Sequence, residues 1–222
     1  MVVQSAVKPG FVKTPGFAKT KGERTRAAIL DEALRLVSKA GLDGLTIGTL
    51  ADATGMSKSG LFAHFGSRDE LLLAVLAHGQ AQFGEVVFQP AIAKPRGLPR
   101  LRAMFVNWLD WTESAELPGG CPMIGGASEF DDKPGPVRDM LAGGQRTWIE
   151  TLKRAVRQAV AERQLAADTD PEQIAFEMFG IALVVHHHRR LLGYEKARSR
   201  ALAAFEALIE RQSVSSKRAA SR

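Results

Sequence analysis

Residues 55–71 read GMSKSGLFAHFGSRDEL, and this stretch decides how the N-terminal part of the chain folds. Gly55 permits a tight turn, and Ser57 is a good N-cap for a helix that begins directly after it. Within that helix Leu61 and Phe65 are four residues apart, so they lie on one face and bury together. The sequence therefore predicts a sharp turn followed by a short helix.

The face of this short helix that is left outside carries no acidic residue. It holds Lys58, Ser59, Ala63 and His64, and the first acid that follows is Asp69. A basic and small-residue face without acids is suited to contact a polyanion, because no negative charge repels the phosphates.

Two further helix starts flank this helix. Thr46 is placed to cap a short helix that runs to Thr54, although Gly48 weakens that helix by about 1 kcal/mol relative to alanine. After the short helix, Ser67 and Glu70 form the Ser-x-x-Glu pattern of a capping box. A capped helix, a tight turn and a second short helix make a helix-turn-helix, whose second member can enter the major groove.

A longer helix is predicted before this motif, and a connecting helix after it. From residue 23 to the stop at Gly41 the apolar residues recur with the 3.6-residue period of one helix face: Ile29, Ala33, Leu36, Val37 and Ala40. The helix that begins at Ser67 is expected to end near Phe88 and to link two domains.

These elements occur in the stretch AAILDEALRLVSKAGLDGLTIGTLADATGMSKSGLFAHFGSRDELL. From Thr25 to about Val75 the chain resembles the N-terminal DNA-binding domain of the TetR family of bacterial transcriptional regulators. The resemblance implies an all-α fold, in which a three-helix helix-turn-helix domain precedes a helical ligand-binding and dimerisation domain. It also implies that the partner is double-stranded operator DNA and that the protein is a homodimeric, ligand-responsive repressor in the cytoplasm.

The resemblance assigns DNA contacts by position. Thr46 is expected to contact a phosphate, and the residues that approach base edges are Ser57, Lys58, Ser59 and Gly60. On the far side, His64 and Arg68 are expected to hold the DNA backbone.

Two positions depart from the family's pattern. Phe62 stands where a tyrosine usually offers its hydroxyl to a phosphate, and Gly60 stands where a small hydroxyl or methyl side chain is common. Phe62 cannot donate that hydrogen bond, so core packing and a DNA contact are both open interpretations of it. Sequence readout is then expected to depend on Lys58, Ser59 and the shape of the DNA.

The formal net charge of +6 is concentrated at the two ends of the 222-residue chain. A basic arm suggests nucleic acid as its partner, and a merely solvated tail is the alternative. We divide the chain into a basic flexible arm (1–22), the helix-turn-helix domain (23–70), a connecting helix (71–89), an effector-binding and dimerisation domain (90–212) and a flexible basic tail (213–222).

The second domain holds aromatic residues at helical spacing, which indicate either a plain core or the lining of an effector pocket. We expect an unidentified small molecule to bind among Phe105, Trp108, Trp111, Cys121 and Trp148. The helix that opens at Pro171 is apolar nearly all round, so a second subunit is expected to cover it. The predicted dimer interface, shared with the last helix, contains Phe179, Leu183, Phe205 and Leu208.

The remaining features support no enzyme and no cofactor. Catalytic triads, phosphate-binding glycine loops and zinc motifs are missing from the sequence, and no apolar run is expected to span a membrane. Residues 186–188 are three consecutive histidines, which point about 100° apart on a helix and do not converge on one metal ion. The only cysteine, Cys121, leaves a thiol-responsive regulator as one alternative, and an effector-independent DNA-binding protein is the other.

Overall fold

The computed structural model describes residues 20–214, and every regular element in this range is a helix. The predicted all-α class is therefore confirmed. The elements of the N-terminal part are α1 (Lys21–Ala40), α2 (Ile47–Thr54), α3 (Lys58–Phe65), α4 (Arg68–Phe83), the π-helical segment η1 (Gly84–Phe88) and α5 (Gln89–Ile92). The C-terminal part contains α6 (Leu98–Thr112), α7 (Pro122–Phe130), α8 (Pro136–Ala161), α9 (Pro171–Arg190) and α10 (Ala197–Arg211).

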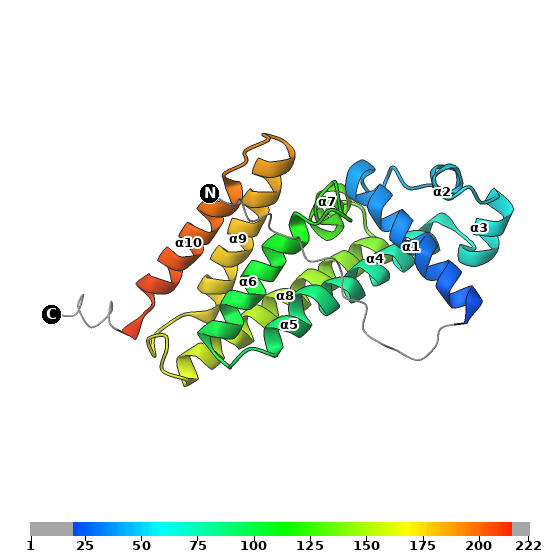
Figure 1. The fold of residues 1–222 in the computed structure, drawn as a ribbon. Helices are drawn as coiled ribbons and strands as arrows, with labels where there is room; N and C mark the ends of the chain where they lie inside the picture. The colour runs from blue at the N-terminus through cyan, green and yellow to red at the C-terminus, as the bar shows by residue number, and fades with distance from the viewer. Residues whose placement is uncertain (1–19, 215–222) are drawn as a thin grey trace, which may run out of the picture.

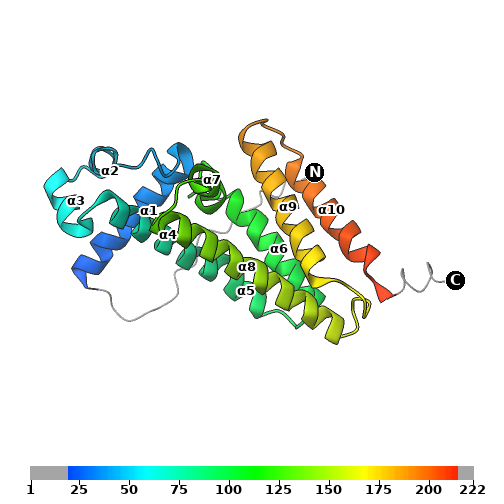
Figure 2. The same ribbon diagram turned by 180° about the vertical axis from the view of Figure 1, so that it is seen from behind.

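The molecule is elongated, with a different group of helices at each end. Figure 1 shows α1, α2 and α3 at one end and the α9–α10 pair at the other, while α4 runs from the first unit toward the second. The view from behind in Figure 2 shows α8 lying along α4 and α6 in the body between them. Most of the predicted arm (1–22) and tail (213–222) lies outside the described residues.

Local capping sets where the N-terminal helices begin. The hydroxyls of Thr46, Ser57 and Ser67 each accept the backbone N–H of the residue three positions later, at 3.0, 3.1 and 3.1 Å. The same chemistry starts α1 two residues earlier than predicted. Thr20 accepts the N–H of Glu23 at 3.2 Å, and the Glu23 carboxylate accepts the N–H of Thr20 at 2.7 Å.

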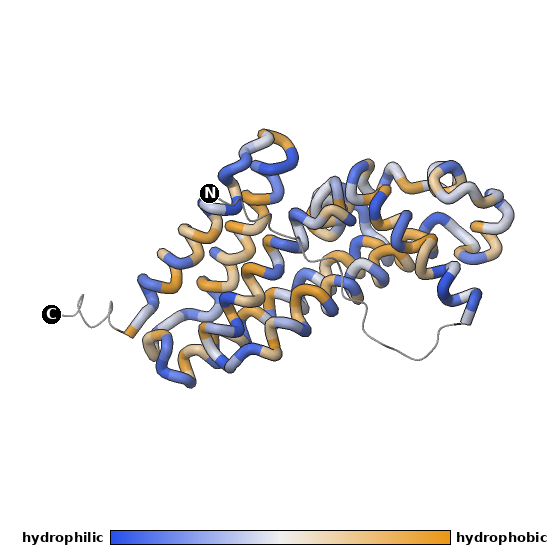
Figure 3. The backbone as a smooth tube through the Cα atoms, viewed as in Figure 1, coloured by the Kyte–Doolittle hydropathy of each residue, from blue (hydrophilic) through white to orange (hydrophobic). Residues whose placement is uncertain are grey.

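The segments α4, η1 and α5 form one continuous helical rod, Arg68–Ile92. It has 25 residues and its most apolar window has a mean hydropathy of 1.4, so by length and composition alone it is apolar enough to cross a membrane. This corrects the expectation that no apolar segment reaches that length. Leu71, Leu72, Val75 and Leu76 are fully buried against the other helices, and Figure 3 shows hydrophobic segments along this rod. The rod therefore uses its apolar side chains as core.

A second connection joins the N-terminal unit to the body through α7. The two carboxylate oxygens of Glu129 accept the backbone N–H groups of Leu42 and Asp43, at 3.1 and 2.9 Å. Nearby, the N–H of Gly119 donates to the Ser38 hydroxyl at 3.1 Å. A Cβ at Gly119 would lie 1.4 Å from the Ser38 carbonyl oxygen, so this close approach requires glycine.

The helix α10 packs into the core more deeply than the sequence predicted. Phe205 and Leu208 are each 1% exposed, and the ring of Phe205 stacks on Phe105 with centroids 4.3 Å apart. The assignment of Phe205 and Leu208 to the dimer interface is therefore wrong, since neither side chain reaches the surface. Phe105 is part of the same stack, which places it between α6 and α10.

The Glu129 carboxylate is expected to contribute measurably to stability. Glu129→Gln leaves only one acceptor oxygen for two backbone N–H groups, so it should lower the free energy of unfolding by about 1–3 kcal/mol. Glu150→Gln is the matched control, because the carboxylate of Glu150 pairs with Lys153 at the surface and such pairs contribute little. Thermal denaturation at equal protein concentration measures both variants. Identical melting of the two variants would contradict this function of Glu129.

Candidate DNA-binding face and ligand cavity

The outward face of α3 is exposed and free of acidic residues. Lys58, Ser59, Ala63 and His64 all lie on the surface, while Leu61 and Phe65 are buried against the N-terminal unit. This is the arrangement that the spacing predicted.

Small hydroxyls and backbone groups line the beginning of this face. Thr46 and Ser57 are exposed, although each hydroxyl already accepts the N–H that caps its own helix. The Ser57 and Ser59 hydroxyls are 3.2 Å apart, and Gly60 donates its N–H to Ser57 at 3.1 Å. The N-caps Thr46 and Ser57 therefore place the first residues of α2 and α3 at the surface of the N-terminal unit.

Phe62 lies on the surface of α3 and is 57% exposed. The interpretation of Phe62 as a core residue is therefore wrong. A phenyl ring that remains this exposed on a helix without acids is available for an apolar contact with a partner.

Arg68 makes several hydrogen bonds within the N-terminal unit. Its Nε donates to the Leu45 carbonyl at 3.1 Å, and its Nη2 donates to the carbonyls of Leu42 and Asp43, each at 3.2 Å. Nη2 also pairs with the Asp43 carboxylate, to which Lys133 donates as well, and the Lys133 hydrogen bond is the main reason that the pKa of Asp43 is lowered. These donors of Arg68 hold the loop between α1 and α2, while 40% of its side chain stays exposed, so its assignment as a DNA backbone contact stays a prediction.

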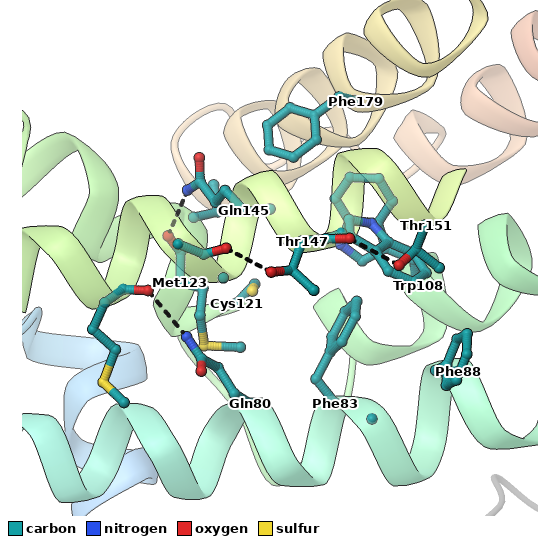
Figure 4. Close-up of a pocket in the computed structure, with 16 residues that line it drawn as sticks. Gln80, Phe83, Phe88, Trp108, Cys121, Met123, Gln145, Thr147, Thr151 and Phe179 are labelled. Atoms are coloured by element: carbon teal, nitrogen blue, oxygen red, sulfur yellow. Dashed lines mark hydrogen bonds between the residues drawn. The ribbon is translucent and has the colours of Figure 1, made fainter. Parts of the chain in front are cut away.

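A cavity of about 640 Å³ lies between α4 and η1 on one side and α6, α7, α8 and α9 on the others. Figure 4 shows its lining, in which aromatic, thioether and amide side chains meet. The lining residues are Gln80, Phe83, Gly84, Phe88, Trp108, Cys121, Met123, Ile124, Met140, Gly143, Gly144, Gln145, Thr147, Trp148, Thr151 and Phe179.

The structure brings three of the five predicted effector residues to this cavity. Trp108, Cys121 and Trp148 line it, whereas Phe105 and Trp111 do not. Phe105 lies in the stack with α10, and Trp111 lies behind the cavity wall, where its Nε1 donates to the Cys121 sulfur at 3.3 Å. The spacing of the aromatic residues pointed correctly to α6, but it did not show which face of α6 lines the cavity.

The sequence interpretation missed the contribution of η1. Phe83 and Phe88 are five residues apart, which places them on different faces of an α-helix but on nearly the same face of a π-helix. The π-helical turn of η1 therefore presents both rings to the cavity. The five-residue spacing of the two phenylalanines was the only signal in the sequence.

Cys121 is buried in the cavity wall at the N-cap of α7. Burial raises the pKa of its thiol above the usual range, and the hydrogen bond from Trp111 only partly opposes this effect. Because reactive cysteines are at least partly exposed, the burial of this thiol argues against a thiol-responsive mechanism.

The three histidines of α9 have different neighbours. His186 packs against Gly120, where an added Cβ would lie 2.7 Å from its Nε2. The burial of the His186 ring lowers its pKa. The ring of His188 instead lies 5.3 Å from Tyr194 between centroids. In the part of the chain that the structure describes, His, Cys, Asp and Glu side chains form no group of three that could hold a metal ion.

One side of α9 faces outward with large apolar side chains. Phe176, Leu183 and Val184 are 74%, 40% and 53% exposed and recur at the spacing of a single helix face. Phe179, which was assigned to the dimer interface, lines the cavity instead, with its ring centroid 5.4 Å from that of Trp108. Of the four predicted interface residues only Leu183 lies on this outward face.

Comparison with known proteins gives matches over both parts of the chain. Residues 29–75 match the family model described as "Bacterial regulatory proteins, tetR family", and residues 97–205 match "Tetracyclin repressor-like, C-terminal domain". The HTH-type transcriptional repressor AcnR of Corynebacterium glutamicum is 34% identical over 77 residues, which are 35% of this chain and 41% of AcnR. The matched part thus spans about two fifths of that relative.

Solved structures share the fold over most of the chain. A TetR transcriptional regulator from Chloroflexus aurantiacus superposes with a TM-score of 0.76 at 24% identity, covering 86% of this chain and 95% of the other. The structure of AibR in complex with isovaleryl coenzyme A and operator DNA has a TM-score of 0.68 at 25% identity, covering 84% and 98%. With family matches on its helix-turn-helix unit and on its C-terminal helices, the chain belongs to the TetR family of transcriptional regulators.

Proposed function

We propose that this chain is a homodimeric repressor that leaves its operator when a small molecule occupies the cavity. The observation that carries the proposal is the rod Arg68–Ile92, which packs against the helix-turn-helix at one end and lines the cavity at the other. A molecule that binds the cavity in only one position of this rod favours the corresponding position of α3. By linkage, operator DNA must then weaken binding of that molecule by the same factor.

The DNA-binding face of the proposal is the outer side of α3. Lys58 and Ser59 are expected at or near base edges, His64 on the backbone, and Thr46 at a phosphate beside α2. Phe62 follows Lys58 by four residues, so its exposed ring lies on the same side of α3. A phenyl ring in the major groove can contact the C5-methyl group of thymine, which no hydrogen bond reads.

A second subunit completes this proposal. Two recognition helices must lie about 34–36 Å apart to enter successive major grooves, which one chain cannot provide. Helix α9 carries the outward apolar face (Phe176, Leu183 and Val184), and α10, which packs against α9, carries the exposed alanines Ala203, Ala204 and Ala207. Large residues on one helix and small residues on its neighbour allow two such pairs to pack closely as a four-helix interface.

The contact of Phe62 with thymine can be tested on an operator selected from random DNA. Replacing thymine by deoxyuridine removes only the methyl group, so a substitution at one position of a single half-site should weaken wild-type binding about fourfold. Phe62→Ala should bind the two DNAs equally. Lys58→Ala is the control, because it should weaken binding yet keep the preference for thymine. Unchanged sensitivity to deoxyuridine in Phe62→Ala would exclude this contact.

The dimer interface can be tested by placing an acid on the α9 face. Val184→Asp should yield a monomer at micromolar concentration in light scattering, since two buried carboxylates would face each other. Its helical content by circular dichroism should persist, because Val184 is exposed within one subunit. Phe62→Asp, at the opposite end of the molecule, should stay dimeric. A monomeric mass for the wild-type protein would refute the homodimer.

Release by a cavity ligand can be tested with a variant whose cavity is filled. Gly143 lines the cavity on α8, and a Cβ added there meets no atom within 4 Å. Gly143→Leu should therefore fold, gain about 1 kcal/mol of helix propensity and bind the selected operator like the wild type. A library compound that releases the wild type should fail to release this variant.

The same screen separates the competing functions. If every releasing compound acts equally on the wild type and on Gly143→Leu, the cavity is not the control site. If no compound in a broad library releases the wild type, the protein is better described as an effector-independent DNA-binding protein.

A further inference from the structure

The lining of the cavity contains no side chain that is charged at neutral pH. Its sixteen described lining residues include no Asp, Glu, Lys, Arg or His. A buried charge without a partner of opposite charge costs far more than hydrophobic contacts return. A carboxylate, phosphate or ammonium group of a ligand would therefore remain unpaired inside this cavity.

The two ends of the cavity differ in chemistry. Figure 4 shows Phe88 and Trp108 toward one end and the amides of Gln80 and Gln145, beside Met123, toward the other. At the aromatic end the rings already meet edge to face, as in Trp108 against Trp148, with centroids 5.6 Å apart. A flat apolar body fits among such rings.

At the amide end, each of two glutamine side chains uses one of its two N–H donors within the protein. Gln80 donates its side-chain N–H to the Met140 carbonyl at 3.3 Å, and Gln145 donates to the Met123 carbonyl at 3.2 Å. Because only the NH₂ group can donate to a carbonyl, these contacts fix which amide atom is the oxygen. Neither amide oxygen has a hydrogen-bond partner among the described residues, and each NH₂ group keeps a second N–H, so each amide offers a ligand both an acceptor and a donor.

The threonine hydroxyls of the cavity wall already donate hydrogen bonds within α8. Thr147 donates to the Gly143 carbonyl at 2.9 Å, and Thr151 donates to the Thr147 carbonyl at 2.8 Å. The Nε1 of Trp148 has no hydrogen-bond partner in the described part of the chain, but it is closed off from water. A ligand therefore meets two side-chain amides at one end and aromatic rings at the other.

We infer that the cavity takes an uncharged molecule with a flat, apolar, aromatic body and one uncharged hydrogen-bonding group such as an O–H or N–H. The body lies among the aromatic rings, and the polar group is directed to the amide of Gln80 or Gln145. The inference rests on the proposed function, because only a repressor gives this ligand a regulatory effect. Binding of the ligand can be measured without DNA.

Three probes of similar skeleton test the inference by equilibrium dialysis against the full chain. N-phenyl-1-naphthylamine is neutral and has an N–H donor, 8-anilinonaphthalene-1-sulfonate is the same skeleton with a negative charge, and 1-benzylnaphthalene is neutral without a donor. The neutral amine should bind at least tenfold more tightly than the sulfonate. It should also bind about fivefold more tightly than the hydrocarbon, the factor expected for one hydrogen bond.

Two variants assign the binding to the cavity. Gly143→Leu should abolish binding of the neutral amine. For each probe, binding to the cavity is the part of the binding to wild type that is absent in Gly143→Leu. Met140→Lys places an ammonium group in the lining and should shift the preference toward the sulfonate. Circular dichroism and melting confirm that both variants are folded before their binding is compared.

Several results would overturn the inference. It is wrong if the sulfonate binds as tightly as the amine in a Gly143→Leu-sensitive manner, if the amine does not bind, or if the hydrocarbon equals the amine. Operator release is measured separately. Binding of the amine class without release of DNA by any such compound would contradict the proposed function alone, whereas release by an anionic compound through the cavity would contradict the ligand class alone.

Discussion

The structure depends on the continuity of the helical rod from Arg68 to Ile92. Its first half supplies Leu71, Leu72, Val75 and Leu76 to the core, each fully buried, and such side chains contribute about 1.5–3 kcal/mol apiece. Its second half lines the cavity. Since a packed helix moves as a unit, the position of the cavity wall and that of the helix-turn-helix are not independent.

The rod is not the only link between the two parts. The Glu129 carboxylate binds the loop after α1, and the Arg68 guanidinium binds the same loop from the start of α4. Helix α7 also contributes Met123 and Ile124 to the cavity. The cavity walls formed by α4 and by α7 are therefore both hydrogen-bonded to the same loop of the N-terminal unit. A ligand that separates α4 from α7 would therefore strain this loop, which carries the N-cap of α2 at Thr46.

The features that the sequence predicted correctly are governed by local interactions. Thr46, Ser57 and Ser67 cap their helices through contacts only three residues away, and Leu61 and Phe65 are buried through the period of one helix. These local contacts do not depend on how the helices pack together. The spacing of residues in the sequence was therefore sufficient to find the helix-turn-helix and the outer face of α3.

The features that the sequence did not predict depend on tertiary packing. The helical period cannot show that Phe105 stacks on Phe205 while Trp108, on the same helix, reaches the cavity. The π-helical turn changes the period itself at Phe83 and Phe88, and Arg68 is drawn to backbone carbonyls that no side-chain pattern reveals. On α9, an apolar residue such as Phe179 serves the cavity while Phe176 faces outward, and composition alone cannot separate the two.

The central claim is that the DNA-binding face and the cavity belong to one mechanical unit. The most direct test is amide hydrogen exchange of the full-length protein with its selected operator and with a duplex of scrambled sequence. We expect the operator alone to change exchange in η1 (Gly84–Phe88) and in α7, although neither segment touches DNA in the proposed complex. Identical exchange in both segments with the two duplexes, when α3 is protected by the operator, would contradict it.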